Sequence, residues 1–444
     1  MEDKVLQMFR DSFERNAIPD ELYRKHDVKK GLRNEDGTGV LIGLTRIADV
    51  VGYKKEDGKK IETEGQLYYR GYSISDIVAH LDEEKICGYE EVCFLLLNGY
   101  LPNKEELKAF MDKLSDNYEL PEGFLSRIIL RSPSLNIMNK LQRSILMMYS
   151  EDVNPDEISI EQTFEKGLGL IAKMPAIIAY TFAGKRHIFD NESLIIHKVD
   201  KKKSIAENIL QLLRADQKYS YEEAKLLDFC LVLHMDHGAG NNSTFTNIVV
   251  SSTGTDIYSC MAAAIGSLKG PKHGGANISV RRMMNEVIEE IGLAATDEEI
   301  RTIVNKILDK DFYDKQGLIY GMGHAVYTLS DPRAQLLKKQ AGIVAKEKGM
   351  NSEFVFYQRF EKIAKEEFKK RKGQNICANV DFYSGLVYSM LEIDEELFTP
   401  MFVCARMTGW LAHNIENKCY CNKIVRPAGK YVGELYDYVE MEDR

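Results

Sequence analysis

Histidines set in glycine-bearing or polar segments are the residues of this sequence best suited to acid–base chemistry. Four of the nine histidines lie in such segments, which read LHMDHGAGNN (233–242), GPKHGGAN (270–277) and GMGHAVY (321–327). An imidazole titrates close to neutrality, so its surroundings decide whether it acts as an acid, a base or a neutral hydrogen-bond donor. The other histidines, at positions 26, 80, 187, 197 and 413, have no comparable setting, and we expect them to have surface or packing roles.

His273 is predicted to lie at or just before the start of a helix. Pro271 precedes it, and the segment 278–292 that follows carries a one-sided apolar stripe. The partial positive charge of a helix N-terminus lowers the pKa of an imidazole, and adjacent glycines let a ligand approach the backbone. This pattern favours a neutral imidazole that donates a hydrogen bond to a developing enolate oxygen. A histidine that only caps a tight turn fits the octapeptide equally well.

A second histidine and an arginine occur in the segment GLIYGMGHAVYTLSDPR (317–333). Backbone donors exposed in the loop Gly321-Met322-Gly323 would suit a phosphate, a carbonyl or an adenine edge. The spacing from His324 to Arg333 allows a guanidinium to face the imidazole across a small anion. The Gly-x-Gly pattern lacks the strand–turn–helix context of a dinucleotide site.

Two further motifs leave alternatives open. His234, Asp236 and His237 have a spacing that could bind a metal, and a structural His234 beside a ligand-facing His237 is equally consistent with it. Asp381, in NVDFYSG (379–385), is either a helix cap or, if desolvated, a strengthened general base.

Arg406 and Arg426 are the candidate anion-binding residues near the end of the chain. Arg406 lies within an apolar helical run, where a guanidinium needs an anionic partner. Arg426 precedes a proline turn. Each could also form an ordinary salt bridge.

Composition excludes several classes of protein. The 444 residues include 59 Lys and Arg against 68 Asp and Glu, and the net charge of −9 argues against a nucleic-acid binder. The eight cysteines are scattered, so we expect reduced thiols, and the C-x-C pair Cys419/Cys421 lacks the partners of a zinc site. The acidic N-terminus does not resemble a signal peptide. We expect a cytoplasmic protein whose most apolar stretch, 168–184, forms a buried helix and not a membrane span.

The elements that position these residues are expected to be mainly helical. Segments 255–268, 278–292 and 399–417 have helical periodicity, and Thr399-Pro400 has the residue types of a helix start. The exception is a short β-hairpin within 40–77, with Asp57-Gly58 in its turn.

Taken together, the motifs resemble the citrate synthase family. Six blocks follow that family's order and spacing: YYRGYSI, LHMDHGAGNNS, LKGPKHGGAN, GMGHAVY…DPRA, NVDFYSGLVY and ARMTGWLAH…IVRP. The resemblance covers the chain from about residue 40 onward. It implies a mainly α, two-domain helical fold, with a large domain formed by 1–272 and 382–444, a small domain formed by 273–381, and the active-site cleft between them. It also implies a homodimer.

The resemblance implies condensation of acetyl-CoA with oxaloacetate and hydrolysis of citryl-CoA to citrate and CoA, an acyltransferase reaction of the tricarboxylic acid cycle. His273 would bond the acetyl-CoA carbonyl, Asp381 would remove a methyl proton, and His324 would polarise the oxaloacetate ketone. No metal or other cofactor is implied.

The resemblance also implies which residues bind the substrates. His237, Arg333 and Arg406 would hold the oxaloacetate carboxylates, and Arg426 would reach the partner subunit's site. Gly321, Met322 and Gly323 would lie beside CoA. Many family members have an acidic residue where this chain has Gly238. The alternative within the family is 2-methylcitrate synthase, which uses propionyl-CoA; the alternatives outside it are a metal-dependent hydrolase and a non-catalytic binding protein.

Overall fold

The structure, a computed structural model, describes residues 4–56, 59–421 and 423–444 and consists of two units. One unit comprises Met1–Gly43 and Val425–Arg444, and the other comprises Leu44–Ile424. The first unit contains helices α1 (Lys4–Arg15) and α2 (Asp20–Lys25) and the 3₁₀ turns η1 (Lys30–Leu32) and η5 (Met441–Asp443).

The unit Leu44–Ile424 contains every candidate site residue except Arg426. Its strands are β1 (Ala48–Glu56), β2 (Lys59–Tyr69) and β3 (Tyr72–Ser73). Its helices are α3 (Ile74–Ala79), α4 (Gly88–Asn98), α5 (Lys104–Asp116), α6 (Ile137–Met148), α7 (Ile160–Phe189), α8 (Ile205–Leu213), α9 (Tyr221–His234), α10 (Asn242–Ser251), α11 (Ile257–Lys269), α12 (Ala276–Ile291), α13 (Asp297–Leu308), α14 (Pro332–Glu347), α15 (Asn351–Lys372), α16 (Val380–Met390) and α17 (Phe398–Tyr420). The π-helix η2 (Leu125–Leu130) and the 3₁₀ turns η3 (Tyr149–Glu151) and η4 (Glu395–Leu397) complete the unit.

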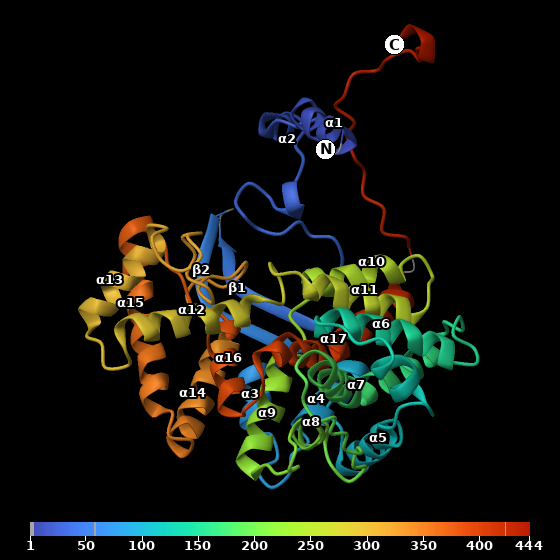
Figure 1. The fold of residues 1–444 in the computed structure, drawn as a ribbon, viewed down its shortest axis with the longest axis vertical. Coiled ribbons are helices and arrows are strands. Elements are labelled where there is room, and N and C mark those ends of the chain that lie inside the picture. Colours follow the sequence, from blue (N-terminus) through green and yellow to red (C-terminus); the bar gives the residue numbers. More distant parts are fainter. Residues whose placement is uncertain (1–3, 57–58, 422) are drawn as a thin grey trace. The chain divides into compact units, whose positions relative to one another are not determined.

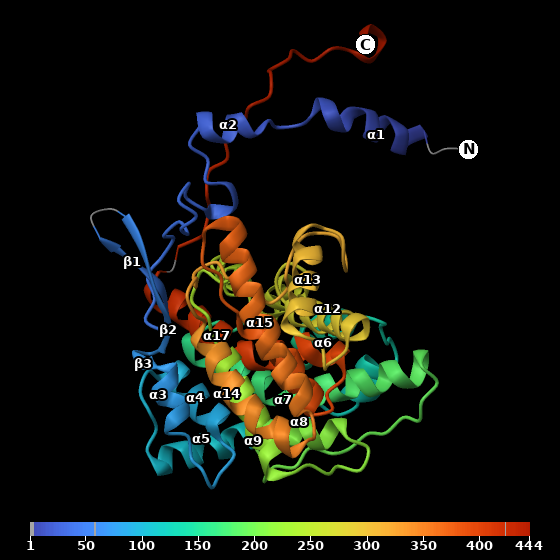
Figure 2. The same cartoon turned by 90° about the vertical axis from the view of Figure 1, so that its left-hand side faces the viewer.

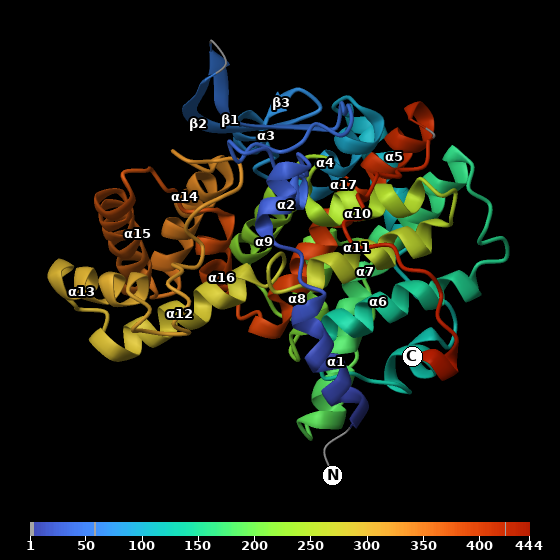
Figure 3. The same cartoon turned by 90° about the horizontal axis from the view of Figure 1, so that it is seen from above.

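Helix α17 is the central element of this unit. It packs against α4, α7, α9, α10 and α11, and its residues from Phe398 to Asn414 are almost all buried. Helices α12 to α16 pack on one another at one side of the unit, as Figures 1 and 3 show. The prediction of a mainly α protein is confirmed. The predicted domain boundaries at 272/273 and 381/382 stay predictions.

Local sequence explains where the helices that flank the site begin and end. Asp256 caps α11 by accepting the Ser259 N–H, and α12 ends before Gly292, whose φ of 76° suits a glycine. The predicted helix start at Thr399 is wrong. Helix α17 follows directly on η4, so Thr399 lies inside it and donates its hydroxyl to the Gly274 carbonyl at 2.9 Å.

The predicted hairpin is confirmed as the antiparallel pair β1–β2, with Glu56 opposite Lys59. The turn residues Asp57 and Gly58 lie outside the described residues. Strand β3 adds to β2 and leads directly into α3, as Figure 2 shows. The register shifts between Val51 and Tyr53, which marks a β-bulge.

Helix α7 contains the apolar stretch 168–184. It is the one helix among residues 4–56, 59–421 and 423–444 that is long and apolar enough to cross a bilayer, and most of its apolar part is buried inside the protein. The expectation of a buried helix is therefore confirmed.

Two buried carboxyl groups lie in the core between α4, α8 and α9. Asp228 accepts the N–H groups of Gly88 and Tyr89, both at 2.9 Å, and Glu90 accepts the Ile205 N–H at 2.7 Å. Each carboxyl group thus accepts hydrogen bonds from backbone N–H groups at the start of a helix. Burial, together with the charge of Asp228, raises the pKa of Glu90 to about 8. Burial also raises the pKa of Asp228 to about 7.

This pair predicts an unusual pH dependence of stability. An acid whose pKa is higher in the folded than in the unfolded state binds more protons when folded, so stability falls as pH rises from about 4.5 through about 8. Glu90→Gln cannot ionise. We expect the free energy of unfolding, measured in urea, to fall by roughly 1–3 kcal/mol more in the wild type than in the variant between pH 6 and pH 9.

The matched control is Glu290→Gln on the exposed face of α12, which should follow the wild type at both pH values. Equal pH dependence in wild type and Glu90→Gln would show that Glu90 does not titrate in this range.

Candidate active site

The turn that carries His237 follows directly on α9. Asp236 Oδ2 accepts the Gly238 N–H at 2.7 Å, and Gly238 has a φ of 80°, in the left-handed region that favours glycine. Gly238, which stands where many relatives were expected to have an acid, is therefore explained by backbone conformation. Burial and the charge of Arg333 hold the pKa of His237 well below its usual value, so the ring is neutral. Its Nε2 is buried without a hydrogen-bond partner among the described residues.

The loop before α14 fixes both the position and the tautomer of His324. Its Nδ1 accepts the backbone N–H groups of Val326 and Tyr327 at 3.0 and 3.1 Å. Because Nδ1 accepts twice, the proton of the ring resides on Nε2. The ring stacks on Tyr327 at 4.7 Å and meets His237 edge to face at 4.9 Å between ring centroids. His324 therefore presents a hydrogen-bond donor beside His237.

Arg333 is held by the residue that caps its helix. Asp331 accepts the Arg333 N–H as the N-cap of α14, and Pro332 takes the first helical position. The same carboxylate accepts from the guanidinium, with Nε at 3.1 Å and Nη2 at 2.8 Å. Arg333 is only 4% exposed. The segment Asp331-Pro332-Arg333 thus holds the Arg333 guanidinium in one orientation.

Arg406 is a fully buried cation that makes few hydrogen bonds with the described residues. Its Nε donates to the His234 carbonyl at 2.7 Å, and its guanidinium lies 4.6 Å from the centre of the Phe402 ring. Both terminal nitrogens are buried and have no hydrogen-bond partner among the described residues. Burial lowers the pKa of Arg406 to about 10, so the group stays charged at neutral pH. A buried, charged donor pair of this kind calls for an anion.

Asp381 lies in the first turn of α16 but does not cap it. The cap is Asn379, whose Oδ1 accepts the Asp381 N–H at 3.0 Å. Burial raises the pKa of Asp381 to about 6, although Arg333 and Arg406 act in the opposite direction. Of the two interpretations from sequence, the structure supports the desolvated base.

His273 lies three residues before α12, as expected from sequence. Its pKa is lowered to about 4, first by burial and then by the charge of Arg406, so the ring is neutral as predicted but chiefly for a different reason. Its Nε2 lies 3.1 Å from Ser243 Oγ, which accepts the indole N–H of Trp410 at 3.2 Å.

The glycines beside His273 have a different role from the one predicted. A Cβ on Gly274 would lie 2.2 Å from the Leu268 carbonyl oxygen and 2.8 Å from Thr399 Cγ2. The space at Gly274 is thus filled by the protein, so this glycine serves close packing of the loop, not ligand access.

The segment Gly321-Met322-Gly323 pairs with the residues just before α16. Gly323 N–H donates to the Cys377 carbonyl at 2.8 Å, and Met322 N–H donates to the Ile319 carbonyl at 3.1 Å. The expectation that these N–H groups are exposed donors is therefore wrong for both residues. A role of this segment beside CoA stays a prediction.

The motif HMDH is engaged with protein partners. His234 Nδ1 lies 2.7 Å from the Cys230 carbonyl oxygen, and Asp236 Oδ1 lies 3.1 Å from Nε2 of the buried His413. Within the described part of the chain, no group of three or more His, Cys, Asp or Glu side chains could hold a metal ion. His234 is a structural residue, as the second interpretation of this motif expected, and the buried His413 has a packing role, as expected from its own setting.

The structure brings most of the predicted residues together around Arg406. The positive charge of Arg406 favours a lower pKa for His237, His273 and Asp381. That of Arg333 does the same for His237 and Asp381. Arg426 belongs to the other unit, where its side chain is exposed, and its role stays a prediction.

Sequence reasoning missed several residues that hold this cluster. They are Tyr69, Asp331, Phe402, Ser243 and Trp410. Only Asp331 had a local signal, because an acid followed by proline is a common helix start. Phe402 and Trp410 lie on α17, each four residues from Arg406, whereas Ser243 contacts His273 from 30 positions away and Tyr69 comes from a distant strand.

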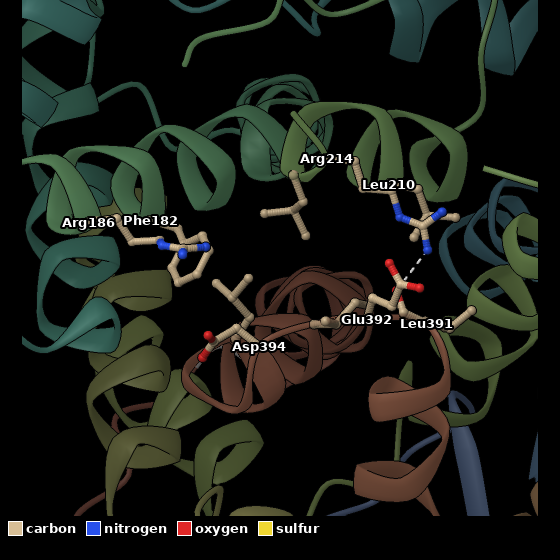
Figure 4. A pocket seen from close by; sticks show the side chains of 10 residues that line it. Phe182, Arg186, Leu210, Arg214, Leu391, Glu392 and Asp394 are labelled. Carbon is tan, nitrogen blue, oxygen red and sulfur yellow. Dashed lines mark hydrogen bonds between the residues drawn. The ribbon is translucent and has the colours of Figure 1, made fainter. Parts of the chain in front are cut away.

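A separate cavity of about 180 Å³ shares no residue with this cluster. Figure 4 shows Phe182 and Arg186 at one end and Leu391 and Glu392 at the other. Its arginines already have partners, since Arg214 pairs with Glu223 at 2.8 Å and Arg186 pairs with Glu192. Both guanidinium groups of this cavity are therefore already paired with carboxylates, whereas the terminal nitrogens of Arg406 have no hydrogen-bond partner among the described residues.

Comparison with known proteins agrees with this geometry. The family model described as "Citrate synthase, C-terminal domain" matches residues 36–428. Citrate synthase of Deinococcus radiodurans is 35% identical over 80% of this chain and 88% of its own length. The 2-methylcitrate synthase 2 of Corynebacterium glutamicum is 30% identical over 92% of this chain and 95% of its own.

A solved structure is similar over almost the whole chain. It is the ternary complex of carboxymethyl coenzyme A and oxaloacetate with citrate synthase from the thermophilic archaeon Thermoplasma acidophilum. The TM-score is 0.75, the identity is 26%, and 94% of this chain and 99% of that chain are covered. Six motifs, a shared fold and a family match across most of its length lead to one conclusion: the chain belongs to the citrate synthase family.

Proposed function

We propose that this protein condenses acetyl-CoA with oxaloacetate and hydrolyses the resulting citryl-CoA to citrate and CoA. One observation carries the proposal: the terminal nitrogens of Arg406 and Nε2 of His237 are buried and have no hydrogen-bond partner in residues 4–56, 59–421 and 423–444. These donors suit a small dicarboxylate, with Arg333 as a second cation nearby. The electrostatic action of Arg406 on Asp381 and His273 means that such an anion would bind next to a base and a neutral donor.

The first step is removal of a methyl proton from acetyl-CoA by Asp381. A thioester α-proton is very weakly acidic, so the carboxylate needs a donor to stabilise the enol oxygen at the same moment. His273 provides this donor. The single proton of Ser243 Oγ has two acceptors within reach, Asn241 Oδ1 at 2.9 Å and His273 Nε2 at 3.1 Å. When Ser243 donates to Nε2, the proton of His273 resides on Nδ1, which donates to the thioester carbonyl.

In the second step the enol carbon attacks the ketone carbon of oxaloacetate. The Nε2–H of His324 donates to the ketone oxygen as negative charge develops there. The new carbon–carbon bond and protonation of the former ketone oxygen give citryl-CoA, and the proton gained there balances the methyl proton that Asp381 removed. Water then cleaves its thioester, with the hydroxyl going to citrate and the proton to the CoA thiolate. These acid–base steps need no cofactor besides the two substrates.

A homodimer, in which Arg426 completes the partner subunit's site, belongs to the same proposal. Large apolar side chains are exposed in the unit that contains Arg426, including Phe9 and Phe13 on α1 and Tyr431, Leu435 and Tyr436. Exposed apolar groups of this size favour a protein–protein contact. A position of CoA beside Gly321–Gly323 and a cytoplasmic location also stay predictions.

Release of CoA tests the reaction and the assigned residues. The wild type should release thiol from acetyl-CoA only when oxaloacetate is present. Loss of the base in Asp381→Ala or of the donor in His273→Ala should lower kcat by roughly 10²–10⁴-fold. A spectrophotometric thiol assay measures both.

The control is His187→Ala, which removes an exposed imidazole at the end of α7 and should keep the full rate. No thiol release by the wild type would contradict the function and favour a non-catalytic binding protein. Near-full rates in both site variants would contradict the mechanism.

The pH profile tests the state of Asp381. The base must be ionised, and burial raises its pKa to about 6. We therefore expect kcat/KM for acetyl-CoA to fall by about tenfold per pH unit below pH 6 and to level off above it. Enzyme held at each pH and then assayed at pH 7.5 controls for inactivation, and a flat profile down to pH 5 would refute the assignment.

Propionyl-CoA distinguishes citrate synthase from 2-methylcitrate synthase, which is represented among the relatives. One methylene changes transition-state binding by about 1–3 kcal/mol, or roughly 10–200-fold in kcat/KM. We expect the higher kcat/KM with acetyl-CoA. A clear preference for propionyl-CoA in parallel assays would instead favour 2-methylcitrate synthase.

A further inference from the structure

The β1–β2 hairpin contacts the loop that carries His324 and Arg333 at the place where its own pairing is irregular. Val51 pairs with Gln66 and Tyr53 pairs with Glu62, so Gly52 alone lies opposite residues 63–65. At this bulge Gly65 N–H donates to Ser330 Oγ at 3.1 Å. Bulges often occur beside active sites, where they redirect the backbone.

Two glycines let the backbone of the hairpin lie closer to residues 326–330 than any residue with a Cβ atom would permit. A Cβ on Gly65 would lie 2.1 Å from the Ser330 carbonyl oxygen and 2.8 Å from Tyr327 Cδ1. A Cβ on Gly52 would lie 2.5 Å from the Val326 carbonyl oxygen. Neither glycine has a positive φ, so space and not backbone conformation requires it.

Hydrogen bonds tie the same surfaces together. Ser330 Oγ donates to Glu64, and Tyr327 Oη donates to the Gln66 carbonyl at 3.2 Å. Tyr327 stacks on His324 and meets the edge of His237 at 5.5 Å between ring centroids. The strand β2 thus reaches both histidine rings through one tyrosine.

The other end of β2 supports the turn that carries His237. The hydroxyl of Tyr69 accepts the Asp236 N–H at 3.2 Å and lies 3.1 Å from the Asp236 carbonyl oxygen. Tyr69 is fully buried, and its hydroxyl also lies 3.2 Å from the Val232 carbonyl oxygen in α9. Gly65 and Tyr69, four positions apart on one strand, therefore contact the His324 loop and the His237 turn respectively.

We propose that strand β2 aligns the His237 turn with the His324 loop, and that Gly52 and Gly65 are positioning residues of the active site. The proposal rests on the proposed function. His237, His324 and Arg333, which the proposed function assigns to oxaloacetate, lie on or next to the segments that the hairpin contacts, whereas Arg406 lies on α17. Asp381 and His273, which act on acetyl-CoA, have no hydrogen bond to the hairpin in the described structure. Displacement of the 326–330 backbone should therefore impair oxaloacetate binding and condensation selectively.

Kinetics of Gly65→Ala and Gly52→Ala, with Gly43→Ala as the matched control, test the proposal. A Cβ on Gly43 would meet nothing within 4 Å, so this variant should match the wild type. Because a misplacement of about 1 Å can cost about 10²-fold, we expect kcat to fall 10–100-fold in Gly65→Ala. KM for oxaloacetate should rise, and KM for acetyl-CoA should stay within about twofold.

Ser330→Ala is the milder second variant, because it removes two hydrogen bonds without a clash, and it should raise KM for oxaloacetate several-fold. A merely structural role of the glycines would lower the melting temperature and the folded fraction but leave both KM values and kcat per folded site unchanged. That result would overturn the proposal.

A crystal structure of Gly65→Ala gives a readout that does not depend on activity. We expect the His324 ring to be displaced relative to His237, while His273 and Asp381 superimpose on the wild type. Unchanged histidine positions would overturn the alignment role even if the enzyme were active. Absence of thiol release by the wild type and Gly43→Ala would instead contradict the proposed function, and the crystal structure would still decide the alignment role.

Discussion

A buried guanidinium whose terminal nitrogens have no hydrogen-bond partner among the described residues determines the properties of this site. Arg406 is fully buried, and within the described part of the chain its Nε alone is hydrogen-bonded to the protein. Burial of an isolated cation is unfavourable. The hydrogen bond to the His234 carbonyl and the contact with the face of the Phe402 ring offset part of this desolvation free energy. The remaining donors are available to a ligand. The same charge, with burial, keeps His237 and His273 neutral, so the site has neutral donors beside fixed cations.

Asp381 shows how burial competes with charge in the same site. Two arginines nearby would by themselves lower the pKa of a carboxyl group, yet the pKa of Asp381 is raised because desolvation is the larger effect. A base with a pKa near 6 is ionised at neutral pH and more basic than an exposed aspartate. An acidic protein with a net charge of −9 thus concentrates positive charge at the place where dianionic substrate is expected.

Local sequence patterns predicted the parts of the structure that depend on near neighbours. The helical stripe of 278–292 placed His273 before a helix, and the apolar surroundings of Asp381 and Arg406 indicated desolvated groups. Interpretations that depended on distant contacts were wrong. Gly274 looked open, but Leu268 and Thr399 fill the space beside it.

Contacts across long stretches of sequence also explain what remained unpredicted. The backbone donors of the Gly321–Gly323 loop looked available because nothing local showed that residues 377–379 pair with it. The hairpin was predicted as a hairpin, but its contact with Ser330 joins residues 265 positions apart. No periodicity records such a contact, since it arises only when the whole unit packs.

The place of α17 in the chain has a consequence for biosynthesis. This helix is the last of its unit, yet it packs against α4, α7, α9, α10 and α11 and supplies Arg406, Phe402 and Trp410. A nascent chain that ends before it would already contain every histidine and carboxylate of the site but neither the central cation nor the helix that closes the core. Its apolar helix faces would be exposed until residue 420 leaves the ribosome, and a site built from such distant segments forms late. The core of this unit and the site around Arg406 are therefore completed together, once α17 has been synthesised.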